Sequence, residues 1–87
     1  MDELKAIYRR ALPAHAAALE AARDTPASEL AHTARRIAHS LRGSGGTYGF
    51  PQVTAAAAAV EDARDTELLQ RIDDLIALLH RVAGEQG

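Results

Sequence analysis

The residues best suited to chemistry lie together in the segment 38–44, which reads Ala-His-Ser-Leu-Arg-Gly-Ser. On a helix, Arg42 falls nearly one turn after His39 and Gly43 falls directly above it, so the three share a face. A neutral imidazole has one ring nitrogen free to attack an electrophile, and an arginine can pair with phosphoryl oxygens. Gly43 places no side chain over the imidazole. This combination suits carrying a phosphoryl group better than abstracting a proton.

His39 is expected to face solvent. At about 100° per residue it lies opposite an apolar stripe through Leu30, Ile37 and Leu41, which argues against a buried structural histidine. Arg35 falls one turn before His39 and adds a second cation near the ring. The simpler interpretation of Arg35 and its neighbour Arg36 is a solubilising helix face.

The composition predicts a small helical protein. The 87 residues are nearly half apolar, but about half of these are alanine, and only Tyr8, Tyr48 and Phe50 are aromatic. A thin core of closely approaching helices fits this composition, and we expect a single domain over residues 1–87. The fold class expected is all-α, an antiparallel up-down four-helix bundle.

Several classes of function are disfavoured by charge and residue content. The chain has no cysteine, which excludes disulfides, thiolate metal sites and cysteine nucleophiles. A formal charge of −2 gives no basic excess for binding nucleic acid, and no apolar stretch approaches the roughly 20 residues that span a bilayer. We therefore expect a cytoplasmic chain, a monomer, that binds neither nucleic acid nor membranes and needs no metal or cofactor of its own.

Helix breaks are predicted near residues 24–26, 43–51 and 64–66, and the short connections favour antiparallel neighbours. Pro13 should kink or split the first helix. Thr25 is the expected N-cap of the second helix, with proline in its first position, and Pro51 opens the third. Thr66 or Asp65 should cap the fourth helix, and Gly84 should end it.

The predicted core stripes follow helical spacing. In order along the chain they comprise Leu4, Ile7, Tyr8, Ala11, Leu12, Leu19, Ala22, Leu30, Ala34, Ile37, Leu41, Tyr48, Val53, Ala56, Ala57, Val60, Leu68, Leu69, Ile72, Leu75, Ile76, Leu79 and Val82. The glycines at 43, 45 and 46 each cost a helix roughly 1 kcal/mol relative to alanine, so the second helix is expected to fray or end early there.

Segment 38–44, followed by Gly49, resembles the His-x-Leu-Lys-Gly-(Ser/Ala)…Gly signature of histidine-containing phosphotransfer (HPt) domains. These domains carry phosphoryl groups in bacterial phosphorelays or form the phospho-accepting domain of chemotaxis kinases. The resemblance implies a four-helix bundle whose accepting histidine is His39. Arg42 stands where the family has lysine, which keeps the charge but changes its shape.

The resemblance also implies roles for other residues. A glutamate or glutamine on the next helix commonly bonds Nδ1 of the accepting histidine, and the matching position is Glu61. Such a carboxylate would leave Nε2 as the nucleophile. The implied partners are a histidine kinase and a response-regulator receiver domain, with the chain acting as a carrier rather than an enzyme. The expected partner-binding residues are Arg35, Arg36, Ser40, Gly43, Ser44 and Gly46.

Other interpretations stay open at this point. The chain could be a degenerate helical module that binds a receiver without chemistry, or the phospho-accepting domain of a chemotaxis-type kinase. His32 lies roughly 10 Å from His39 along the helix, too far to share a metal ion. His15 and His80 have no supporting neighbours, and the glycine run lacks the ending of a phosphate-binding loop.

Overall fold

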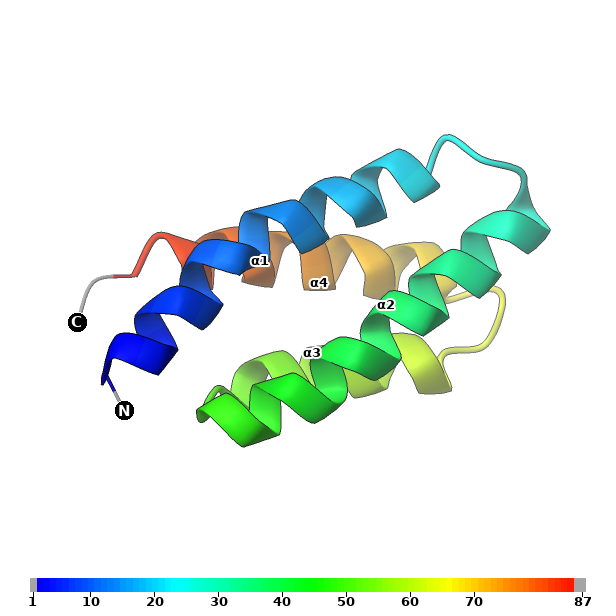
Figure 1. Cartoon of the computed structure of the whole chain (residues 1–87). Coiled ribbons are helices and arrows are strands. Elements are labelled where there is room, and N and C mark those ends of the chain that lie inside the picture. Colours follow the sequence, from blue (N-terminus) through cyan, green and yellow to red (C-terminus); the bar gives the residue numbers. More distant parts are fainter. Residues whose placement is uncertain (1, 86–87) are drawn as a thin grey trace.

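The computed structural model describes residues 2–85, and this part of the chain contains four helices and no strand. The helices are α1 (Asp2–Ala22), α2 (Ala27–Tyr48), α3 (Pro51–Asp62) and α4 (Leu68–Ala83). Figure 1 shows that the chain turns back at each loop, so the start of α1 and the end of α4 lie at the same end of the molecule. Helix α2 packs chiefly against α3, and α1 packs chiefly against α4.

Helix α1 continues through Pro13 and is not split there. Pro13 lies on the exposed side, whereas Leu12, Ala16 and Leu19 are fully buried on the other side. Packing on both sides of the proline therefore holds the helix together despite the lost backbone donor. A kink at Pro13 stays a prediction.

Helix α2 begins one residue later than predicted. Its N-cap is Pro26, whose carbonyl accepts the first helical hydrogen bond from Leu30, and the N-cap has no side-chain hydrogen bond. The prediction of Thr25 as N-cap is wrong because its hydroxyl instead donates to the carbonyl of Ala22, at the end of α1.

The predicted fraying of α2 at its glycines is also wrong. The helix runs through them to Tyr48 and ends at Gly49, whose φ of 84° is the left-handed conformation that glycine adopts without strain. Gly45 is buried, and the Tyr48 ring stacks on Tyr8 with centroids 4.8 Å apart. These tertiary contacts outweigh the low helix propensity of glycine.

Helices α3 and α4 match the predicted ends except at one cap. Pro51 opens α3 and Gly84 ends α4, as predicted. Neither Thr66 nor Asp65 caps α4, because both lie inside a turn closed by the Glu67 N–H bonding to the Arg64 carbonyl at 2.8 Å. Glu67 is the N-cap, with no side-chain hydrogen bond.

One cluster of buried apolar side chains lies between the four helices. Its largest fully buried members are leucines, isoleucine and valines from every helix: Leu12, Leu19, Leu41, Ile72, Leu75, Leu79, Val53, Val60 and Val82. The predicted core positions Leu4, Ile7 and Leu69 are wrong, since each is about half exposed. These three side chains lie at the edges of the apolar faces of their helices, and it is the centres of those faces that pack inside the bundle. Ala11 is exposed as well.

Over the described residues 2–85, no helix is both long enough and apolar enough to cross a bilayer.

Candidate functional site

His39 projects from the middle of α2 into solvent. Its side chain is 80% exposed, while its neighbours Ala38 and Leu41 are buried in the core. The apolar period of α2 therefore fixes one side of the helix against the bundle and leaves His39 on the other. The imidazole can be reached by a partner without any change in the core.

Glu61 on α3 reaches across the seam between the two helices and bonds the imidazole. Its Oε2 lies 3.0 Å from His39 Nδ1, and the Glu61 side chain is only 20% exposed. Partial burial raises the pKa of the Glu61 carboxyl, but the hydrogen bonds from His39 and Arg42, with their charges, outweigh it and lower that pKa below its usual value. Glu61 is therefore ionised at neutral pH.

The ionised carboxylate determines which ring nitrogen holds the proton. A carboxylate can only accept a hydrogen bond, so Nδ1 of His39 must be the donor. In the neutral ring the lone pair is then on Nε2, the nitrogen that is left free of Glu61. The contact thus sets a tautomer with Nε2 available for attack.

Arg42 binds the same carboxylate from the other side. Its Nη1 donates to Glu61 Oε1 at 3.3 Å, and its side chain is half exposed. The two carboxylate oxygens therefore bind one partner each, and the guanidinium lies beside the imidazole. A long and half-exposed ion pair of this kind is weak, so the guanidinium can be drawn to another anion.

The predicted partner-facing residues of α2 separate into two groups. Ser40, Gly43 and Gly46 are exposed, and a Cβ atom added at Gly43 would meet nothing within 4 Å. Ser44 instead lies toward α1, where its hydroxyl and that of Tyr8 are 2.7 Å apart. The open face beside His39 is therefore made by the first group.

The two arginines preceding His39 also differ. Arg35 Nη2 donates to the carbonyl of Ala63 at 2.9 Å and lies 3.7 Å from an Asp65 carboxylate oxygen, so it connects α2 to the end of α3. Arg36 is exposed on the His39 side of α2. Arg36 is therefore the more exposed of the two arginines.

Two residues at the seam were missed by the sequence analysis. The Thr54 hydroxyl donates to the carbonyl of Arg42 at 2.9 Å, and buried Gly45 lies directly against Thr54. The position of Gly45, four residues after Leu41 on the core stripe, was a signal that this glycine faces a neighbouring helix. Nothing in the local sequence identified Thr54.

The remaining histidines lie apart from this site. His80 Nε2 is 2.9 Å from Glu20 Oε1, which pairs α4 with α1, and His32 is exposed on α2. Across the described residues 2–85, no three His, Cys, Asp or Glu side chains are grouped so as to hold a metal ion.

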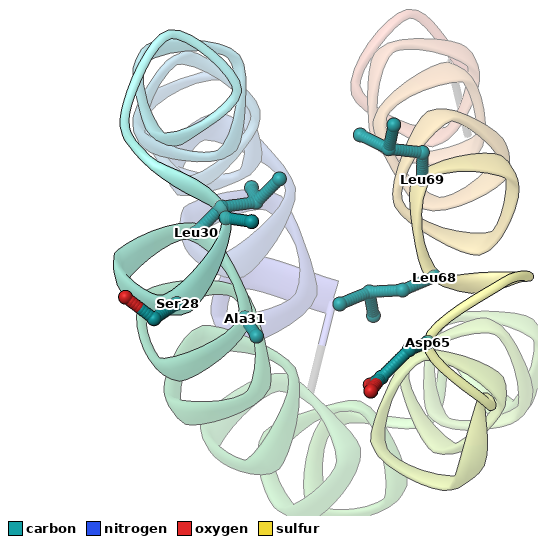
Figure 2. A pocket seen from close by; sticks show the side chains of 7 residues that line it. Ser28, Leu30, Ala31, Asp65, Leu68 and Leu69 are labelled. Carbon is teal, nitrogen blue, oxygen red and sulfur yellow. The ribbon is translucent and has the colours of Figure 1, made fainter.

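An apolar hollow of about 320 Å³ lies at the other end of α2. It is lined by Ala27, Ser28, Leu30, Ala31, Asp65, Leu68 and Leu69. Figure 2 shows the leucines of α2 and α4 facing one another across it. None of the residues around His39 takes part in it.

In this helical bundle, the exposed His39 is oriented by a carboxylate from the next helix, and the same carboxylate binds the Arg42 cation. The family model described as Hpt domain matches residues 3–85, and the chain therefore belongs to the Hpt domain family. Neither the curated proteins nor the solved structures contain a match to the chain.

Proposed function

We propose that this chain is a phosphorelay intermediate, in which His39 accepts a phosphoryl group and passes it to the aspartate of a receiver domain. The observation that carries the proposal is the 3.0 Å contact between His39 Nδ1 and the ionised Glu61 carboxylate, which holds a proton on Nδ1 and leaves Nε2 as the free nitrogen of the neutral ring. Membership of the Hpt domain family supports the same role. The proposal takes residues 1–87 as one domain and the bundle as up-down and antiparallel, as the chain reversals in Figure 1 indicate.

The proposed chemical step needs no proton transfer. The Nε2 lone pair of His39 forms the N–P bond while the P–O bond to the donor breaks. The electrons of that P–O bond leave with the carboxylate of the receiver aspartate or, where the donor is ATP bound to a kinase, with ADP. The ring keeps its Nδ1 proton and gains positive charge. The Glu61 carboxylate bonded to that proton stabilises this charge, and the reverse step discharges the ring.

Arg42 is proposed to contact the transferred phosphoryl group. Its guanidinium holds Glu61 at 3.3 Å and is half exposed, so it can turn toward oxygens attached at Nε2. Arginine binds such oxygens through a planar fork of donors, whereas a lysine would act as a compact point charge. Movement of Arg42 to the phosphoryl group would leave the Glu61 carboxylate to the ring alone.

The proposed partners are a histidine kinase and a response-regulator receiver domain, which bind over Arg36, Ser40, Gly43 and Gly46. These residues are exposed beside His39, and the absence of side chains at the two glycines allows a protein surface to approach the ring. A carrier of this kind acts in the cytoplasm as a monomer, and its partners supply the catalytic metal ion and the nucleotide. The interface is small and transient because the partner must leave.

The test uses phosphoramidate, a small phosphoryl donor that needs no protein partner. Wild type and His39→Gln are treated at neutral pH, and the products are read by intact mass and site mapping. We expect a single acid-labile phosphoryl group on His39 and none in the variant. An unmodified wild type, or labelling spread equally over His15, His32 and His80, would refute the proposal and favour a binding module without chemistry.

A further inference from the structure

The contact between His39 and Glu61 lies between two hydrogen bonds that cross the same helix seam. On one side, the Thr54 hydroxyl of α3 donates to the carbonyl of Arg42 on α2 at 2.9 Å. On the other side, Arg35 of α2 donates from Nη2 to the carbonyl of Ala63, next to the end of α3, at 2.9 Å. We call Thr54 and Arg35 the seam bracket.

The Thr54 side of the seam is very closely packed. A Cβ atom added at Gly45 would lie 2.7 Å from the Thr54 hydroxyl oxygen and 3.0 Å from the Thr54 backbone nitrogen. Thr54 and Glu61 are seven residues apart on α3, or about two turns, so they share the face turned toward α2. The hydroxyl therefore fixes the register of that face against α2 two turns before Glu61.

The Arg35 side fixes the far end of the same face. Ala63 is the C-cap of α3, and its carbonyl lies among the end groups that a helix leaves without internal partners. The Arg35 guanidinium supplies a donor there and places positive charge at the negative end of the helix dipole. The Asp65 carboxylate, 3.7 Å away, holds the same guanidinium from the following loop.

We propose that Thr54 and Arg35 are positioning residues for phosphoryl acceptance, acting through Glu61. A glutamate side chain has three rotatable bonds. Its hydrogen bond to an exposed ring is lost if α3 slides along α2 by about one ångström or less. The seam bracket prevents that shift on both sides of the contact, and so keeps His39 protonated on Nδ1. This role rests on the proposed function, but the tautomer it predicts can be measured without any phosphoryl transfer.

The experiment compares wild type with Thr54→Val, Arg35→Met and the double variant. Nitrogen NMR of ¹⁵N-labelled histidine distinguishes the Nδ1–H from the Nε2–H form of His39. Thr47→Val is the matched control, because its hydroxyl donates at 3.1 Å to the Gly43 carbonyl within α2 and does not reach α3. Thermal unfolding identifies the variants that are folded, and the single substitutions remain informative if the double variant is not.

We expect wild type and Thr47→Val to hold His39 as Nδ1–H, and the seam variants to show a mixture with Nε2–H. Labelling of His39 by phosphoramidate should slow by about tenfold in the double variant, since small misplacements of reacting groups cost that much or more. An unchanged tautomer in the folded seam variants would overturn the inference, as would an equal change in Thr47→Val. A wild type that shows Nδ1–H but takes no phosphoryl group would refute the proposed function, and only the part of the inference in which the seam bracket sets the His39 tautomer through Glu61 would stand.

Discussion

At the scale of single residues, Glu61 connects the parts of the site. One carboxylate oxygen accepts from His39 and the other from Arg42, so the nucleophile and the cation are oriented by the same side chain. Both donors lie on α2 and the carboxylate lies on α3, so the geometry of the site depends on how these two helices pack. A substitution at Glu61 can therefore remove its negative charge while keeping a side chain of the same size that still holds an oxygen acceptor.

Replacing Glu61 with glutamine keeps its size but removes the charge. A nearby opposite charge stabilises a charged group by about one pKa unit or more, so labelling of His39 by phosphoramidate should slow by about tenfold. The glutamine amide can also turn and donate to Nδ1, which favours the tautomer that cannot attack from Nε2. Rates equal to wild type in a folded Glu61→Gln would contradict the role of the carboxylate.

The lowered pKa of Glu61 gives this contact a defined pH dependence. The ordinary pKa of a glutamate side chain is 4.5, and the pKa of Glu61 in the folded protein is lowered from it. The stability that this contact contributes is therefore fully present above about pH 4.5 and is lost as pH falls through the folded pKa. Carboxyl ¹³C shifts should give a Glu61 midpoint below the ordinary glutamate value, and His39→Gln should move that midpoint upward.

Gly43 provides a test of partner access at the residue scale. Because a Cβ atom there meets nothing within 4 Å, Gly43→Trp should fold normally and still be labelled by the small donor phosphoramidate. Transfer to a receiver that discharges the wild type should fall by more than about tenfold, since the large ring blocks the approach of a protein surface. Gly43→Ala is the control, and transfer at the wild-type rate in Gly43→Trp would remove the steric argument.

Much of the site could be predicted from residue types and spacing. His39 was expected on the exposed face of its helix because the apolar period places it opposite Leu41, and it lies there. The bond from Arg42 to Glu61 and the separation of Ser44 from the open face were not predicted. They depend on distances across helix seams, which the pattern within one helix does not encode.

At the scale of elements, α2 shows why local propensity was an incomplete guide. Its glycines predicted an early end, but Gly45 packs against α3, and Gly49 is the residue that ends the helix. The predicted caps failed for a similar reason, since the hydroxyl of Thr25 and the turn around Thr66 take part in other local structure. The apolar periodicity was enough to predict that the helices form. Their exact ends could not be predicted in the same way, because they depend on contacts with neighbouring residues.

Gly45 and Gly43 should respond in opposite ways to alanine. At Gly45 the new methyl group would lie 2.7 Å from the Thr54 hydroxyl and 3.1 Å from the Phe50 carbonyl, so the α2–α3 seam must open. Overpacking of this kind costs about 1–3 kcal/mol. At Gly43 the methyl group is unobstructed, and alanine should stabilise the helix by about 1 kcal/mol. Urea unfolding measures both, and equal effects would contradict the close approach at Gly45.

At the scale of the whole molecule, the bundle is held by a thin core and a ring of specific seam contacts. Tyr8 stacks on Tyr48 and on Phe50, with centroids 4.8 Å and 5.4 Å away, and so joins α1 to the end of α2 and to the N-cap of α3. Burial raises the pKa of the Tyr8 hydroxyl, although its bond to Ser44 opposes the shift. The aromatic residues thus close the end of the bundle where the chain begins. Their mutual packing was not predicted.

The core and the site should be separable, because the His39 side chain is 80% exposed whereas the largest buried side chains form the cluster inside the bundle. A chain of this size has about 4–13 kcal/mol of stability in total, and Leu79→Ala should remove about 2–5 kcal/mol of it, since Leu79 is fully buried. Leu69→Ala, at a side chain that is 49% exposed, should cost less than about 1 kcal/mol. Ile72→Val is the milder core variant if Leu79→Ala does not fold.

Urea unfolding gives the free energies, and histidine NMR should find the same His39 tautomer in every folded variant. A tautomer that follows core stability would mean that the site is held by the whole bundle and not by the α2–α3 seam.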